Sequence, residues 1–263
     1  KYERKDKFCF AGAYYHRYPK RTAVFDKFAK IFLEMKGLDI YDRNYQNSRP
    51  EHAFPSEYEP YILGKLESNE IDVAYKGYIY GINMNSVDQS QTMFARRVFE
   101  MMASNTITIG NYSRGVKNLF GDLTICTNDS EELRNRLRAI CENERNYRKY
   151  RLAGLRKVLS EHLYEDRLSY IIDKVFGLEL KKEMPFINLI LRDNGNTAYG
   201  IETFHKLKYK NKKLYIIGDR EELGHKNIVV ISKEDANNVI INEFFADGMI
   251  GVLSTDNYYG ENY

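Results

Sequence analysis

One stretch of the sequence, residues 78–120, constrains the fold more than any other. It begins with an uncharged run of aromatic and β-branched residues over 78–84, which is typical of a strand buried on both faces of a parallel sheet. A helix is predicted over 92–103 and a second short strand over 107–109. Apolar residues at helical spacing give that helix a buried stripe: Phe94, Val98, Met101 and Met102. The pattern predicts one and a half repeats of a parallel α/β unit.

The two loops of this stretch are candidate ligand sites. The polar loop 85–91 follows the first strand, and the segment 113–115 (Ser113-Arg114-Gly115) precedes a helix start at Val116. In parallel α/β folds, phosphates bind where the carboxyl ends of strands meet helix amino-termini. We therefore expect the backbone N–H groups of 113–115 to cradle a phosphate, with a plain N-cap as the alternative. Asn85 and Ser86 are expected to bond a base or a sugar.

These blocks carry a family resemblance. GINMNS, TMFARRVFEMMAS, NYSRG and KNLFG occur in order and resemble the nucleotide-sugar-binding domain of bacterial GT-B glycosyltransferases of the spore-maturation type. The earlier blocks FAGAY and LDIYDRN are similar to the same group, so the resemblance covers roughly residues 8–177. In that group a glutamate within R-x-F-E-x-x-A holds the donor ribose, which points to Glu100. The wider superfamily often has a second glutamate eight residues earlier, where this chain has Thr92.

The resemblance implies further donor-binding residues. Arg97 is a candidate for the diphosphate, because a guanidinium matches phosphate oxygens in a bidentate way. A threonine hydroxyl at Thr92 can still bond a phosphate or sugar oxygen, without charge. The ordinary alternative is that Glu100 pairs with Arg96 or Arg97 on an exposed helix face.

The first part of the chain adds three candidates. A strand is predicted to end at Gly12, where a ligand can approach the backbone closely. His16 lies in the loop that follows, and Arg43 follows the second predicted strand over 38–41. A helix over 22–35 connects the two strands. Each of the two side chains, His16 and Arg43, can also be read as an exposed loop residue.

The later part of the chain predicts a second domain. Residues 143–176 read as two helices broken near 161–164. The expected organisation is a Rossmann-like domain over 1–177, a linker over 178–185 and a smaller α/β segment over 186–263. In that segment strands are predicted at 186–192, 213–218, 227–231 and 249–253, and helices at 198–207 and 236–245.

The segment 186–263 resembles the first half of a GT-A, family-2-type glycosyltransferase domain. In that family an aspartate after the second strand contacts the nucleotide, here Asp219, and the last strand carries a D-x-D metal motif. The matching residues are Ser254, Thr255 and Asp256, so one carboxylate remains. Because Mg²⁺ or Mn²⁺ usually needs more than one carboxylate beside substrate phosphates, we expect this segment to be silent or incomplete, and a metal at Asp256 is doubtful.

Composition excludes several classes of function. A net charge of +3 over 263 residues is too small to favour nucleic-acid binding. The cysteines at 9, 126 and 141 form no C-x-x-C pair and fit a reducing cytoplasm. No apolar run approaches the roughly 20 residues that span a bilayer. The five histidines show no ligand spacing, so no zinc site is predicted, and no metal in the first domain.

The sequence thus predicts an α/β glycosyltransferase fragment, of hexosyltransferase type, that binds a nucleotide-diphosphate sugar. Its expected acceptor is a glycan or cell-surface polymer, and its expected location is the bacterial cytoplasm, at the inner face of the membrane. The chain starts at Lys1 rather than Met, and we expect a partner amino-terminal domain to supply the acceptor site and the catalytic base, so no catalytic residue is named. The alternative is a non-catalytic nucleotide-sugar-binding or scaffold module built from degenerate transferase domains.

Overall fold

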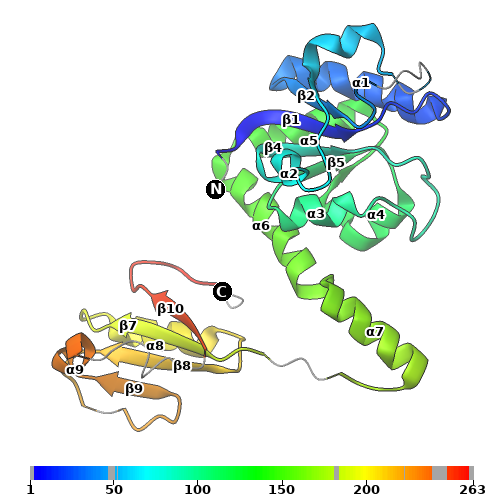
Figure 1. Ribbon diagram of the computed structural model, residues 1–263. Coiled ribbons are helices and arrows are strands. Elements are labelled where there is room, and N and C mark those ends of the chain that lie inside the picture. Colours follow the sequence, from blue (N-terminus) through cyan, green and yellow to red (C-terminus); the bar gives the residue numbers. More distant parts are fainter. Residues whose placement is uncertain are drawn as a thin grey trace. The chain divides into compact units, whose positions relative to one another are not determined.

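The computed structural model describes residues 3–46, 51, 53–180, 184–221, 223–238 and 248–260. The chain divides into two compact units, Lys1–Leu178 and Glu179–Tyr263. Each unit is built on a parallel β-sheet flanked by helices (Figure 1). The predicted α/β fold class is therefore confirmed. Among the described helices, none is long and apolar enough to cross a membrane.

The sheet of the first unit has six parallel strands in the order β3-β2-β1-β4-β5-β6. Chain order and sheet order diverge between β1 and β4, so the topological switch point lies between these two strands, as in doubly wound nucleotide-binding folds. The strands are β1 (Lys5–Gly12), β2 (Leu38–Asp42), β3 (Ile62–Gly64), β4 (Tyr78–Asn83), β5 (Ile107–Gly110) and β6 (Ile125–Cys126).

Seven α-helices are found in the described part of this unit. They are α1 (Pro19–Met35), α2 (Asp72–Lys76), α3 (Arg97–Ala103), α4 (Arg114–Phe120), α5 (Ser130–Cys141), α6 (Glu144–Glu161) and α7 (Tyr164–Phe176), with two 3₁₀ segments, η2 (Ser56–Tyr61) and η3 (Gly121–Leu123). The predicted break between α6 and α7 is confirmed. The carboxylate of Asp166 accepts a hydrogen bond from Leu163 N at 2.9 Å and so starts α7.

The predicted helix over 92–103 is wrong in its first part, because α3 begins only at Arg97. In the segment before α3, backbone N–H groups donate hydrogen bonds to side-chain oxygens instead of to helical carbonyls. Asn85 Oδ1 accepts from Ala95 N at 3.3 Å, and Ser90 Oγ accepts from Met93 N at 3.0 Å. Such local side-chain bonds compete with helix formation. Thr92 therefore lies in an irregular segment.

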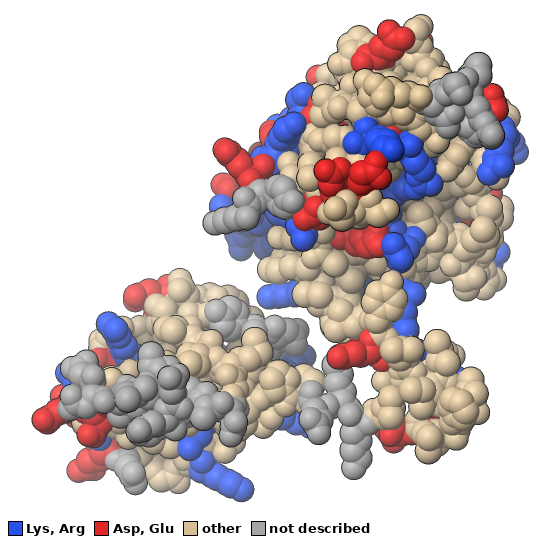
Figure 2. All heavy atoms as spheres, in the orientation of Figure 1, with Lys and Arg blue, Asp and Glu red and all other residues tan. Residues whose placement is uncertain are grey.

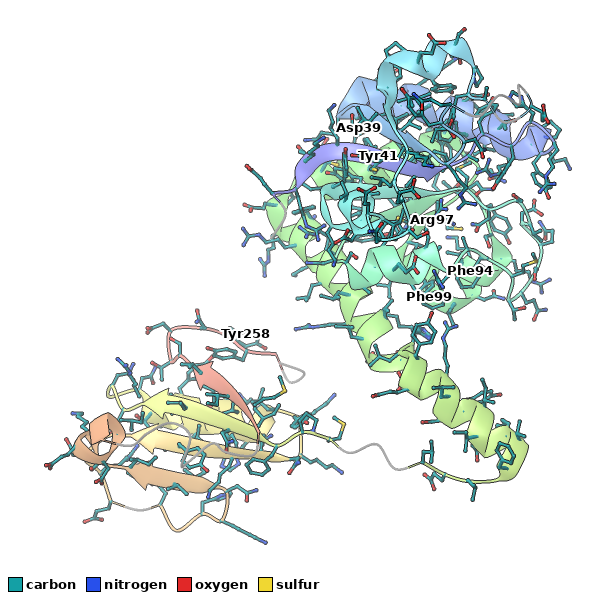
Figure 3. The ribbon with its side chains drawn as sticks, in the orientation of Figure 1. Asp39, Tyr41, Phe94, Arg97, Phe99 and Tyr258 are labelled. Carbon is teal, nitrogen blue, oxygen red and sulfur yellow. The ribbon has the colours of Figure 1, made fainter. Side chains whose placement is uncertain are left out.

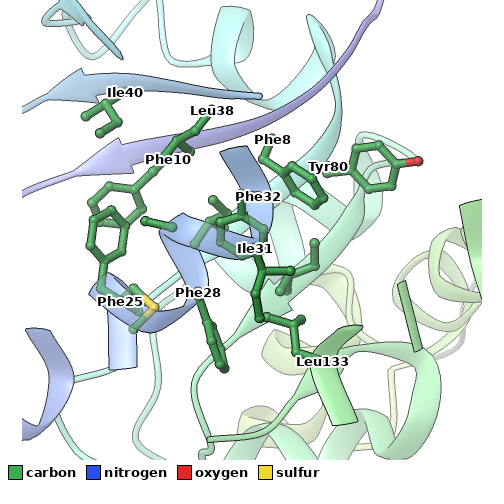
Figure 4. Packing of buried hydrophobic residues seen from close by; sticks show 14 of the residues in the cluster. Phe8, Phe10, Phe25, Phe28, Ile31, Phe32, Leu38, Ile40, Tyr80 and Leu133 are labelled. Carbon is green, nitrogen blue, oxygen red and sulfur yellow. The ribbon is translucent and has the colours of Figure 1, made fainter. Parts of the chain in front are cut away.

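The core shows why β1 is apolar from Phe8 to Gly12. Phe8 and Phe10 point to the face covered by α1 and α5, where Phe8 stacks on Phe32 with ring centroids 4.4 Å apart (Figure 4). Cys9 and Ala11 alternate to the opposite face, where they pack with residues of α2 and α3. Successive residues of a strand face opposite sides of its sheet, so a central strand covered by helices on both faces has few polar positions.

The second unit has four described strands, all parallel, in the order β10-β7-β8-β9. The elements are β7 (Ile187–Arg192), α8 (Thr197–Lys206), β8 (Lys212–Ile217), β9 (Ile228–Ile231), α9 (Lys233–Asn238) and β10 (Met249–Leu253). The helix predicted over 236–245 begins earlier, at Lys233, and its part over 239–245 lies outside the described residues. The topological switch point of the second unit's sheet lies between β10 and β7.

Candidate functional site

A cleft opens at the carboxyl edge of the first unit's sheet, at the switch point. It has two adjoining compartments that share Gly12, Arg43, Ala95 and Arg97. The β2-side compartment has a volume of about 600 Å³, and the β4-side compartment has a volume of about 300 Å³. Ligands of open parallel sheets bind in this position.

β1 ends at Gly12, as predicted, and this residue lies at the junction of the two compartments. A Cβ atom added there would lie 2.7 Å from Cζ of Phe10, whose ring is buried in the core. A larger side chain would therefore displace core packing and also narrow the cleft.

Arg21 is a cleft residue that sequence reasoning missed. It lies in the first turns of α1, is only 6% exposed, and lines the β4-side compartment. Its Nε donates to Met84 O and one terminal nitrogen donates to Ala13 O, both at 3.2 Å. The side chain thus joins the ends of β1 and β4. Burial lowers its pKa to about 10, and Arg97 adds to that lowering by charge repulsion, so the guanidinium is charged at neutral pH.

Two more arginines converge on the same compartment. Arg97 is the first residue of α3, and its Nε is buried without a hydrogen-bond partner in the described residues. Arg43 is exposed and reaches the hydroxyl of Tyr15 at 3.4 Å. The Tyr15 ring also lies 5.0 Å from the Arg21 guanidinium carbon. No Asp or Glu is among the described residues lining this compartment, so three cations face it without a carboxylate. Such a site is suited to an anion.

The β2-side compartment is mixed in charge and partly aromatic. Glu100 and Glu67 face it together with Tyr41, Tyr75 and Lys65. Figure 2 shows Lys and Arg side chains beside Asp and Glu side chains on this unit. In Figure 3, Arg97 lies between Tyr41 of this compartment and Phe94 of the other.

Glu100 forms the ion pair of its ordinary interpretation and also lies at the cleft. Its Oε1 accepts from Arg96 Nε at 2.6 Å, one helical turn earlier, so the ordinary ion pair is present. Its carboxylate also lines the cleft. The pKa of the neighbouring Tyr75 hydroxyl is raised, mainly by burial, with a smaller raising effect from Glu100 and an opposing effect from Arg97. These three side chains therefore interact at the cleft wall.

Asn85 and Ser86 both line the β4-side compartment, but Asn85 is bound to the protein. Its N–H donates to Asn111 Oδ1 at 2.7 Å, and its own Oδ1 accepts from Asn83 Nδ2 at 3.0 Å as well as from Ala95 N. Asn85 therefore shapes the cleft by holding the segment before α3. Ser86 is exposed and presents its hydroxyl to the compartment.

The structure does not bring the other candidates of the first unit into the cleft. His16 Nε2 lies 2.9 Å from Ala53 O. Ser113 is fully buried at the start of α4, makes no side-chain cap, and its N–H contacts Cys126 Sγ. The N–H of Arg114 donates to Asp88 O at 2.7 Å. The expected phosphate cradle at 113–115 is thus occupied by the protein's own groups. Gly115 and Thr92 line a separate groove.

In the second unit Asp219 and Asp256 are exposed after β8 and β10. Asp219 forms an ion pair with Lys233 at 3.4 Å, and Asp256 N donates to Ser254 Oγ at 3.3 Å. At the switch point, Asn194 Nδ2 donates to Thr255 Oγ1 at 2.6 Å. Across the described residues of both units, no group of three or more His, Cys, Asp or Glu could hold a metal ion.

A sequence signal for Arg21 did exist. It precedes Phe25 and Phe28 by four and seven residues on α1, which places it on the buried face of an amphipathic helix. A charged residue on such a face is rarely buried without a reason. Lys65, Tyr41 and Tyr75 carry no comparable signal, because their approach to the cleft depends on tertiary packing.

Comparisons with known proteins place this cleft in context. Residues 43–173 match a protein family described as glycosyl transferase-like, and this range contains Arg43, Arg97 and Glu100. No curated protein matches the chain. Sucrose-phosphate synthase from Thermosynechococcus elongatus is similar in structure, with a TM-score of 0.47 and 16% sequence identity, over 66% of this chain and 46% of that one. This chain therefore spans less than half the length of the synthase. The part of the first unit that carries these three cleft residues is thus similar to a glycosyl transferase-like family.

Proposed function

We propose that the first unit binds a nucleotide-diphosphate sugar and takes part in transfer of the sugar to a glycan or polymer acceptor. The observation that carries this proposal is the set of three arginines, Arg21, Arg43 and Arg97, around a compartment whose described lining holds no carboxylate. A diphosphate would supply the missing negative charge, and the family match over residues 43–173 supports glycosyl transfer as the chemistry.

In this proposal the two compartments divide the donor. The diphosphate and its sugar lie in the β4-side compartment, where Ser86 can bond a hydroxyl. The nucleoside lies in the β2-side compartment, where Glu100 accepts from the ribose hydroxyls and the Tyr41 and Tyr75 rings contact the base. As the sugar leaves, negative charge grows on the diphosphate. The arginines stabilise that charge in place of a metal ion.

The remaining parts of the reaction belong to groups outside this cleft. The proposed acceptor, of a hexosyl type of transfer, is a glycan or cell-surface polymer at the cytoplasmic face of a bacterial membrane. A partner amino-terminal domain would supply the acceptor site and the catalytic base. The second unit would add a nucleotide contact at Asp219 but little metal affinity at Asp256, because a single carboxylate binds Mg²⁺ or Mn²⁺ weakly.

A thermal-shift experiment tests the proposal. A ligand that binds only the folded state raises the melting temperature with its concentration relative to Kd. UDP, GDP, CDP and dTDP are compared, with and without Mn²⁺, on the wild type and Glu100→Ala. We expect one nucleotide to stabilise the protein without metal, and Glu100→Ala to lose most of that shift. A metal-dependent shift that ignores Glu100 would instead place the site at Asp219 and Asp256.

The non-catalytic scaffold or sensor role remains the second candidate. One observation favours it: the Glu100 carboxylate is paired with Arg96. Sugar transfer or donor hydrolysis by the protein, abolished by Glu100→Ala, would exclude it. Nucleotide-sugar binding without turnover in the presence of its partner domain would support it.

A further inference from the structure

A second hollow of the first unit lies beside the donor cleft. It is a groove of about 410 Å³ between the segment before α3, helices α3 and α4, and the start of α7. Phe94 lines both this groove and the β4-side compartment, and Arg96 lines both the groove and the β2-side compartment. The groove and the cleft are thus separated only by the chain around residues 94–96.

The groove has an aromatic wall. Phe94 and Phe99 stack with ring centroids 5.4 Å apart and planes 25° apart, and both are labelled in Figure 3. The Arg167 guanidinium of α7 lies 4.4 Å from the Phe99 ring centroid. Phe99 and Phe120 make an edge-to-face contact with their ring centroids 5.1 Å apart. Because the stack is held from two sides, its position is fixed before any ligand arrives.

The rim of the groove is polar and unused. Gln91, Thr92 and Asn118 are exposed, and within the described residues their side chains form no hydrogen bond with the protein. The described lining contains no Asp or Glu. Gly115 lies at the base of the groove, where a Cβ would lie 2.9 Å from Gln91 O and 3.0 Å from the Phe94 ring. Because Gly115 has no side chain, the aromatic wall at Phe94 and the polar rim at Gln91 can approach each other.

From this arrangement we infer that the groove binds sugar residues of the acceptor glycan that neighbour the reacting residue, which the proposed partner domain would hold. A pyranose ring has an apolar C–H face and a belt of hydroxyl groups. Phe94 and Phe99 supply apolar surface for the C–H face of the sugar. The amides of Gln91 and Asn118, together with the Arg167 guanidinium, supply hydrogen bonds for its hydroxyl groups. A few polar groups around an apolar wall are typical of ligand sites.

The position of the groove gives the inference its functional meaning. A glycan bound along it would direct one end past Phe94 toward the sugar-bearing side of the donor cleft. This inference rests on the proposed function for the choice of an acceptor glycan, but binding of sugars in the groove can be measured without a donor. A failure of this inference is therefore distinguishable from a failure of the proposed function.

The test is isothermal titration of the full chain with maltotetraose, cellotetraose and chitotetraose. The variants are Asn118→Ala and the double variant Asn118→Ala/Arg167→Ala, and the control is Arg156→Ala, an exposed arginine of α6. We expect at least one tetrasaccharide to bind the wild type and the control equally. The double variant should bind it about tenfold or more weakly, since it loses one neutral and one charge-assisted hydrogen bond.

Asn118→Ala alone guards against misfolding, because the Asn118 side chain is exposed and forms no hydrogen bond within the described residues. It should keep the wild-type melting temperature and lose a smaller part of the affinity. Nucleotide-induced thermal shifts should be unchanged in both variants. Absence of binding for all three tetrasaccharides at millimolar concentration, or equal affinity in the double variant, would overturn the inference, whatever the nucleotide result.

Discussion

Glu100 Oε1 accepts a hydrogen bond from Arg96 Nε at 2.6 Å, and the two residues lie one turn apart on α3. The Arg96 side chain is 75% exposed and that of Glu100 is 34% exposed. Exposed pairs of this kind contribute little stability because water screens them. The pair therefore holds Glu100 at the edge of the cleft only weakly, and in the proposed function ribose hydroxyls would replace the guanidinium.

Loss of Arg96 should improve donor binding slightly. In Arg96→Gln the Glu100 carboxylate is released before the nucleotide arrives, so we expect nucleoside diphosphate affinity to rise by about twofold to fivefold. Titration calorimetry measures this. A tenfold loss of affinity would instead show that Arg96 itself contacts the ligand.

Loss of Arg21 should have a much larger effect on nucleoside diphosphate binding than on the stability of the folded protein. Arg21→Met removes a buried charge, which offsets part of the cost of losing its bonds to the carbonyls of Ala13 and Met84. We expect the ligand-free melting temperature to change by only a few degrees and nucleoside diphosphate affinity to fall about tenfold or more. Arg17→Met, at an exposed arginine in the turn before α1, is the control. A large loss of stability with unchanged affinity would make Arg21 a purely structural residue.

Acid should destabilise the first unit through Asp39. This carboxylate is buried in β2, and burial alone raises its pKa. Bonds from Lys7 Nζ at 2.9 Å and the Tyr78 hydroxyl at 2.8 Å more than reverse that effect, so its pKa is lowered (Figure 3). A lowered folded-state pKa gives stability that is complete above the ordinary aspartate value of about 3.9 and is lost as pH falls below it.

The corresponding variant is Asp39→Asn. At pH 7 it should cost about 2 kcal/mol of unfolding free energy, and the difference from the wild type should shrink below about pH 4. Urea unfolding between pH 3 and 7 gives both quantities. A difference that stays constant over this range would contradict the pKa argument.

Protonation of His162 should loosen the junction of α6 and α7. Its Nε2 is buried without a partner in the described residues, and its ring lies against Phe99 and Phe120 at 5.4 and 5.6 Å. Burial lowers its pKa, so the folded state binds fewer protons than the unfolded one. The stabilisation is complete above the ordinary histidine value of about 6.5 and declines as pH falls below it.

Hydrogen exchange measures this effect locally. Between pH 7.5 and 5.5, amides near residues 158–167 should lose more protection, corrected for intrinsic rates, than amides of β4. His162→Leu should abolish the difference. Equal pH dependence in the variant would assign the effect to another group, such as Glu161 or Asp166.

Much of the architecture was predictable from local patterns. The uncharged run at 78–84 and the amphipathic helices gave the strand and helix order, because periodicity reflects which face is buried. The Asp129 cap of α5 was likewise predictable, and its side chain accepts from Glu131 N and Glu132 N. The beginning of α3 was not, because Asn85, a residue ten positions away, decides it.

The site was less predictable than the fold. Gly12, Arg43, Arg97 and Glu100 were found because they follow strands or match a motif. Arg21 was missed because its role depends on how α1 packs against the ends of β1 and β4. Ser113 and Arg114 have the sequence of a phosphate loop, but Cys126 and Asp88 occupy their N–H groups. Such competition is visible only in three dimensions.

In the proposed function, the arginine-lined compartment binds the diphosphate of a nucleotide donor. This binding is tested most directly with the base that the thermal-shift experiment selects. Its nucleoside, nucleoside monophosphate and nucleoside diphosphate are each titrated into the wild type, Arg97→Ala and the surface control Arg148→Ala. Arg97 repels the buried Arg21 guanidinium, which offsets its favourable interaction with Tyr75, so its removal should leave the melting temperature nearly unchanged. We predict that Arg97→Ala weakens diphosphate binding about tenfold or more and leaves nucleoside binding unchanged. Equal diphosphate affinity in Arg97→Ala and the wild type would contradict the account.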